Sequence, residues 1–164
     1  MFYGEVDDVI AAAKFASQLA YVDSSRLFVV GHSTGGTLAM LASLTTDIFA
    51  SAASFGGSPD QTAFLRDWGK LAPFDRSNRE EVRLRSPDRF PASLRCPLLL
   101  FVGSQDTAYL ESTKSFTQIC QRLKKPCTLY VVEGDHFTSL RPAIKKSIQL
   151  FHDLKSPKTI PMVK

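Results

Sequence analysis

The strongest constraint on the fold is a glycine-rich turn, Gly31 to Gly36, between two segments of different character. The turn has the sequence Gly-His-Ser-Thr-Gly-Gly. It follows the apolar run 27–30, typical of a strand, and precedes residues 37–42, which are helix-like. A G-x-S-x-G pentapeptide between a strand and a helix is typical of a nucleophile elbow, a sharp turn that exposes its serine. The context therefore favours Ser33 as a nucleophile over a bystander serine in a glycine-rich turn.

Strand-like and helix-like segments alternate along the rest of the chain. The predicted strands are the apolar runs at 27–30, 48–55, 97–102 and 127–132. Helical periodicity is found at 5–20, after the elbow, from about Ala108 to Leu123, and at 144–154. Short, continuous apolar runs favour strands that are buried on both faces of a parallel sheet. The pattern predicts an α/β fold with three layers, α/β/α, and a mostly parallel sheet of about four core strands.

The length of 164 residues predicts one domain, which we place at residues 1–155, and residues 156–164 are predicted to be a frayed tail. Residues 58–95 are polar and rich in arginine, and they are predicted to form an excursion with one or two short helices. Trp68 and Phe74 in this excursion are candidates for an apolar substrate pocket. Packing of the excursion onto the body of the domain is the favoured interpretation of both side chains.

The composition argues against several classes of partner. The net charge is only +4, and arginines alternate with acidic residues in 75–89, so no basic face for nucleic acid is predicted. No apolar run reaches the about 18 residues that a membrane span needs. Three cysteines without metal-ligand spacing are predicted to be buried free thiols in a reducing compartment: Cys96, Cys120 and Cys127. We expect a cytoplasmic protein without a metal, a cofactor, or a nucleic-acid or membrane partner.

Three residues suited to acyl transfer follow three of the predicted strands: Ser33, Asp106 and His136. The carboxyl ends of parallel strands meet at one edge of a sheet, where ligands bind. A serine hydroxyl needs a base to take its proton, a histidine has a suitable pKa, and a carboxylate can orient the imidazole. Asp106 could instead cap the helix that follows it. Asp135, which adjoins His136, is the fallback acid.

The two other histidines are expected to have no chemical role. His32 lies inside the elbow, but its side chain is predicted to point away from the nucleophile, and His152 lies on the last predicted helix. Both are predicted to be structural or exposed to solvent.

Several segments together resemble the α/β-hydrolase superfamily, in which the chain order Ser, Asp, His is expected. Residues 21–26 leading into the elbow carry the resemblance to the superfamily. Residues 86–90, 96–106 and 133–137 resemble the acid and histidine segments of prolyl-oligopeptidase-like serine peptidases. Dienelactone-hydrolase-like esterases are the other similar branch.

The resemblance implies a serine hydrolase that cleaves an ester or a peptide-like acyl bond in a small molecule or a peptide. Ser33 would be the nucleophile, His136 the general base and then acid, and Asp106 the residue that orients His136. The backbone N–H of Thr34 would supply one donor of the oxyanion hole.

One feature departs from the superfamily pattern. Only about 26 residues precede the elbow strand, whereas superfamily members usually have several strands there and a loop that supplies the second oxyanion donor. We expect a fragment of a longer chain, a partner or second copy that covers the exposed sheet edge, or a reduced form of the enzyme. A non-catalytic interaction protein is the competing hypothesis.

Overall fold

The structure, a computed structural model, describes residues 4–154 and is built on a four-stranded sheet in the order β1-β2-β3-β4. All three strand pairs are parallel. The strands are β1 (Phe28–His32), β2 (Ser51–Phe55), β3 (Leu98–Gly103) and β4 (Cys127–Val132). The α/β class and the parallel sheet predicted from the sequence are thus confirmed.

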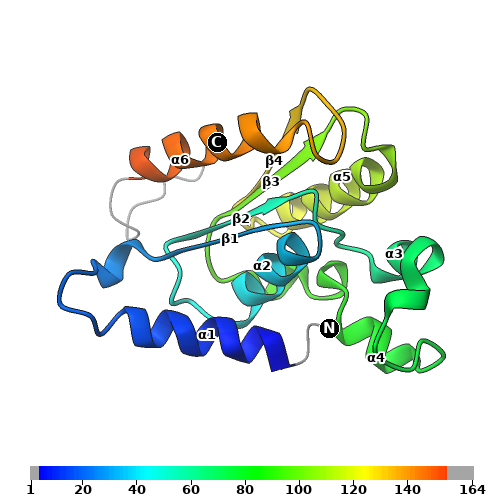
Figure 1. The fold of residues 1–164 in the computed structure, drawn as a ribbon, viewed down its shortest axis with the longest axis horizontal. Helices are drawn as coiled ribbons and strands as arrows, with labels where there is room; N and C mark the ends of the chain where they lie inside the picture. Colours follow the sequence, from blue (N-terminus) through cyan, green and yellow to red (C-terminus); the bar gives the residue numbers. More distant parts are fainter. Residues whose placement is uncertain (1–3, 155–164) are drawn as a thin grey trace.

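Helices cover both faces of the sheet (Figure 1). On one face lie α2 (Thr34–Thr45) and α5 (Thr107–Arg122), whose side chains share a core with β3. On the other face lies α6 (Leu140–Asp153), which packs through Phe151 onto a second, smaller core. The first helix, α1 (Gly4–Ala16), packs on the outer side of α2 through Val6. The two central strands, β2 and β3, are buried almost throughout, as expected for parallel strands with helices on both faces.

The predicted second strand is shorter in the structure than in the sequence analysis. Strand β2 begins at Ser51, three residues after the predicted start at Ile48. Ile48 and Phe49 nevertheless pack against the larger core from the loop before the strand. An apolar run thus marks burial here, and burial alone does not distinguish a strand from the loop that leads into it.

Residues 58–95 contain two short helices, where one or two were predicted. These are α3 (Gln61–Trp68) and α4 (Arg79–Leu84), and they are joined to the core by short 3-10 turns at 69–71, 87–89 and 91–93. Another 3-10 turn lies at 24–26, before β1. In Figure 1 both α3 and α4 lie at the same end of the molecule. The predicted tail, 156–164, lies outside the described residues, and the domain boundary stays a prediction.

Strand β1 forms one edge of the sheet. Strand β1 pairs only with β2 among the described residues, and Val30 at its centre is 53% exposed. The exposed edge expected from the sequence is therefore present.

Burial of all three cysteines agrees with the prediction of free thiols: Cys96, Cys120 and Cys127 are unpaired and buried. Burial raises the pKa of the Cys96 thiol to about 12, which leaves it protonated and unreactive. Within residues 4–154, none of the helices has both the length and the apolar character needed to cross a membrane.

Candidate active site

The turn at Ser33 has the strained geometry of a nucleophile elbow. Ser33 has φ 56° and ψ −120°, a left-handed backbone conformation that costs a non-glycine residue about 1–3 kcal/mol. Two hydrogen bonds fix the turn: the Ser33 N–H donates to the Phe55 carbonyl (2.8 Å), and the Thr37 N–H donates to the Ser33 carbonyl (3.1 Å). A side chain at Gly31 would overlap the Gly35 carbonyl, so the glycine is required by the tightness of the turn.

Asp106 and His136 form a buried hydrogen-bonded pair. His136 Nδ1 lies 2.6 Å from Asp106 Oδ2, and their side chains are 19% and 7% exposed. A carboxylate only accepts hydrogen bonds, so Nδ1 carries the proton, and Nε2 of the neutral ring is left as a base. Gly56 lies against the ring, because a Cβ there would come within 2.9 Å of His136 Cε1.

The hydrogen bonds do not support the two alternative interpretations, in which Asp106 caps a helix or Asp135 is the acid. Asp106 does occupy the N-cap position of α5, but its side chain makes no capping hydrogen bond. The Asp135 carboxylate instead accepts hydrogen bonds from the N–H of Thr138 (2.7 Å) and of Phe137 (2.9 Å). These bonds, that of Thr138 most strongly, lower the pKa of Asp135. Asp135 therefore shapes the loop that carries His136.

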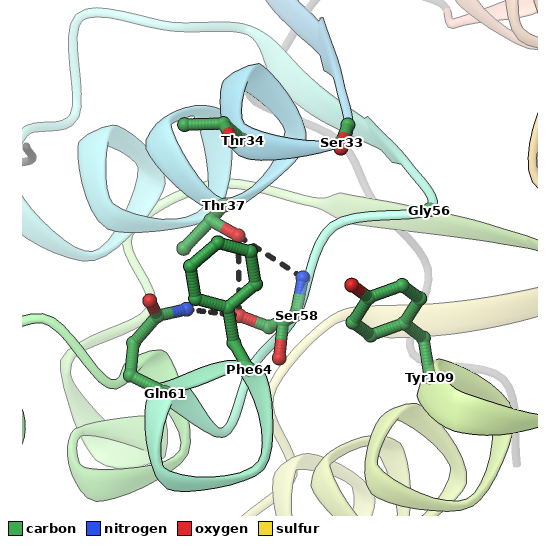
Figure 2. A pocket seen from close by; sticks show the side chains of 8 residues that line it. All are labelled: Ser33, Thr34, Thr37, Gly56, Ser58, Gln61, Phe64 and Tyr109. Atoms are coloured by element: carbon green, nitrogen blue, oxygen red, sulfur yellow. Dashed lines mark hydrogen bonds between the residues drawn. The ribbon is translucent and has the colours of Figure 1, made fainter. Parts of the chain in front are cut away.

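Ser33 lines a pocket beside this pair (Figure 2). The lining residues are Ser33, Thr34, Thr37, Gly56, Ser58, Gln61, Phe64 and Tyr109. Gly56 borders both this pocket and the His136 ring. The ring centroids of Tyr109, which also lines the pocket, and His136 are 5.6 Å apart. The nucleophile and the base therefore border the same region. The hydrogen bonds of the described residues do not include one between Ser33 and His136; in apo enzymes such bonds are often long and tighten with substrate.

The far side of the pocket is polar and buried. The Ser58 N–H donates to the Thr37 hydroxyl (3.0 Å), and Gln61 Nε2 donates to the Ser58 carbonyl (3.1 Å), as Figure 2 shows. Gln61 is 1% exposed, and its Oε1 accepts no hydrogen bond among the described residues. Burial raises the pKa of the Tyr109 hydroxyl, and the charge of Asp106 adds to the effect. Tyr109 is therefore a neutral group at the pocket.

The structure does not place the two predicted pocket aromatics in this pocket. The Arg85 guanidinium carbon lies 4.1 Å from the centroid of the Phe74 ring, a contact within the excursion itself, so packing of Phe74 onto the body of the domain stays a prediction. Trp68 is 52% exposed and does not line this pocket. The aromatic lining residues are Phe64 and Tyr109, which the sequence analysis missed. Tyr109 could have been found from its position three residues after Asp106.

Thr34 is the first residue of α2, so its N–H has no carbonyl partner within the helix. This N–H belongs to the positive end of the helix dipole, and it borders the pocket with Ser33. It therefore has the setting that an oxyanion donor needs.

His152 is exposed on α6, and His32 is half-buried and hydrogen-bonded to the His136 backbone, so each has one of the two predicted settings, exposed or structural. Within the described part of the chain, no group of three His, Cys, Asp or Glu side chains could hold a metal ion.

The chain is similar to several known proteins. Residues 3–151 match the model of the prolyl oligopeptidase family. No curated protein matches the chain significantly. A solved puromycin-hydrolysing peptidase of Mycobacterium tuberculosis is 26% identical, with a TM-score of 0.77, over 90% of this chain and 24% of that one.

Two further solved structures show the fold alone. The acylaminoacyl peptidase of Pyrococcus horikoshii is 20% identical, with a TM-score of 0.80, over 98% of this chain and 29% of its own. A putative dienelactone hydrolase of Klebsiella pneumoniae is 15% identical, with a TM-score of 0.66, over 91% of this chain and 60% of its own. The chain thus spans about a quarter of the length of the two peptidases.

Proposed function

Because this chain belongs to the prolyl oligopeptidase family, we propose that it is a serine hydrolase domain that cleaves acyl bonds through Ser33, His136 and Asp106. The observation that carries the proposal is the hydrogen bond of His136 Nδ1 to the buried Asp106 carboxylate. This bond leaves Nε2 as a base at the end of the sheet where the strained elbow exposes Ser33.

In the first half of the reaction, His136 Nε2 takes the Ser33 proton while Oγ attacks the carbonyl carbon of the substrate. The oxyanion that forms accepts a hydrogen bond from the Thr34 N–H. Collapse of the tetrahedral intermediate breaks the acyl bond, and the imidazolium gives its proton to the leaving amine or alcohol. In the second half, His136 activates a water that releases the acid from the ester on Ser33. Asp106 remains ionised and stabilises the imidazolium in both halves.

Peptides are the proposed substrates, with small-molecule esters as the alternative class. The family supports peptides, and Phe64 and Tyr109 place aromatic side chains in the lining of the pocket that Ser33 borders. The three unpaired, buried cysteines support a reducing compartment such as the cytoplasm.

A fluorophosphonate probe tests the proposal, because it phosphonylates a serine only when a base activates that serine. We expect mass spectrometry to locate the label on Ser33, and we expect Ser33→Ala to abolish it. Ser24→Ala, at an exposed serine before β1, is the matched control and should be labelled at the normal rate. Folded protein that stays unlabelled beside a reactive serine hydrolase would overturn the proposal.

The free edge of β1 favours a second candidate, a non-catalytic module that binds a partner, an upstream segment or a second copy through that edge. This candidate predicts a complex in solution and no loss of function in Ser33→Ala. A monodisperse monomer whose esterase activity disappears in Ser33→Ala would rule it out.

A further inference from the structure

The loop that carries His136 crosses the carboxyl end of the sheet from one edge to the other. It leaves β4 at Val132, and β4 is three strands away from β1, the strand that ends before Ser33. The Ser104 N–H donates to the Val132 carbonyl (2.7 Å), and the Gln105 N–H donates to the Gly134 carbonyl (3.0 Å). These bonds fasten the start of the loop to the segment that follows β3.

At the far end of its path, the loop is held by His32, the last residue of β1. His32 Nε2 lies 2.9 Å from the backbone carbonyl oxygen of His136. The His32 ring also packs against the rings of His136 and Phe137, with centroid distances of 4.7 and 5.8 Å. A carbonyl oxygen only accepts hydrogen bonds, so His32 must carry its proton on Nε2.

We propose that His32 is a positioning residue that fixes the base relative to the nucleophile by bonding the His136 carbonyl. The inference rests on the proposed function and adds a role for His32 within it. Ser33 directly follows His32 in the chain, so this one hydrogen bond links the strand that positions the nucleophile to the backbone of the base. The Asp106 carboxylate fixes the rotation of the imidazole, and His32 fixes the point of the backbone from which the imidazole extends. His32 does not line the pocket, so it should have little effect on substrate binding.

The test compares His32→Ala and His32→Gln with wild type in the full chain, by the rate of fluorophosphonate labelling and by ester hydrolysis. Loss of a hydrogen bond of about 1.4 kcal/mol corresponds to about a tenfold slower reaction. We expect His32→Ala to lose about tenfold in labelling rate and kcat with KM nearly unchanged. The glutamine amide can donate to the same carbonyl, so His32→Gln should recover most of the rate. His152→Ala, on the exposed face of α6, is the matched control and should behave as wild type.

A second measurement does not depend on activity. Nitrogen-15 NMR of the histidine rings should show His32 protonated on Nε2, and the His136 signals should shift in His32→Ala but not in His152→Ala. The inference is overturned if His32→Ala reacts as fast as wild type, if glutamine is no better than alanine, or if the His136 signals do not move. If even wild type is unreactive, the proposed hydrolase function fails, and the NMR result still decides whether His32 holds the loop.

Discussion

The two sides of the candidate site differ in the hydrogen bonding of their buried polar atoms. The histidine side, made of His32, Asp106 and His136, is a connected chain of hydrogen bonds from one sheet edge inward. The pocket side is formed by residues 58–95 together with the start of α2. It retains two buried oxygens that accept no hydrogen bond in the described structure, Gln61 Oε1 and Asp88 Oδ1, of which Asp88 Oδ1 lies 3.5 Å from Arg89 Nε in an ion pair.

This difference predicts that changes on the two sides affect different quantities, the reaction rate and the stability of the fold. The hydrogen bonds of His32 and Asp106 hold the backbone and the ring of His136 in one geometry, which proton transfer needs, so changes on the histidine side should lower the reaction rate. A buried acceptor without a partner costs stability, about 1–3 kcal/mol for a fully buried group. Changes on the pocket side should therefore affect stability or substrate choice more than the proton transfer itself.

The largest effect among the following variants is expected for Asp106→Asn. The asparagine amide can donate a hydrogen bond to His136 Nδ1, which stabilises the tautomer with the proton on Nε2. That tautomer has no base to take the Ser33 proton, so kcat/KM should fall by roughly 10³–10⁴. Steady-state hydrolysis of a chromogenic ester measures the loss. Asp135→Asn, in the same loop region but bonded to backbone N–H groups, is the control and should lose far less. Equal losses in the two variants would show that the histidine side is not organised as described.

A smaller effect is expected when the Thr34 N–H is removed on the pocket side. Replacement of the peptide N–H by an ester oxygen keeps the side chain and deletes one oxyanion donor, so kcat should fall by about 10²–10³. Thr34→Ala keeps the N–H and should retain nearly full kcat. If the ester variant and Thr34→Ala have the same kcat as wild type, Thr34 is not an oxyanion donor.

The smallest effect is expected in the stability of Asp88→Asn. Burial raises the pKa of Asp88 above its ordinary value of 3.8, so the folded state binds the proton more tightly than the unfolded state. Stability then falls as the pH rises from about 3.8 through the folded-state pKa, and the cost is fully present at neutral pH. Asp88→Asn should therefore stabilise the fold at neutral pH by up to about 1 kcal/mol and lose this advantage in acid.

Urea unfolding at neutral and acidic pH measures this difference. Asp75→Asn is a control for which the opposite change in stability is expected. Hydrogen bonds from Ser77 lower the pKa of the exposed Asp75 carboxyl, so removal of this carboxylate should destabilise the fold at neutral pH. Destabilisation by Asp88→Asn at neutral pH would contradict the assignment of a burial cost on the pocket side.

The sequence predicts the histidine side far better than the pocket side. Ser33, Asp106 and His136 each follow a strand, and parallel strands bring their carboxyl ends together, so their approximate location follows from the order of elements alone. The pocket depends on how residues 58–95 fold back over the elbow. No local pattern encodes this, and so Phe64 was missed, whereas Tyr109 on α5 could have been found from its position after Asp106.

Helix α6 shows the same limit in the packing. Ile144 and Ile148 have the spacing of an apolar helix face, yet they are 39% and 61% exposed, while Ala143 and Ser147 are buried. Small side chains let the helix approach the sheet closely, and periodicity alone does not reveal which of two adjacent stripes faces inward. The contact of His32 with the loop was missed for a related reason, since it arises only where the loop crosses the sheet.

The most direct test of the account is the pre-steady-state hydrolysis of an activated aryl ester, with release of the phenol followed on the millisecond timescale. Acyl transfer through Ser33 predicts a rapid burst of phenol equal in amount to the protein, followed by slower turnover, with the acyl group found on Ser33 after quenching. The burst should be absent in Ser33→Ala. A burst that persists in Ser33→Ala, or an acyl group on another residue, would contradict the assignment of Ser33 as the nucleophile.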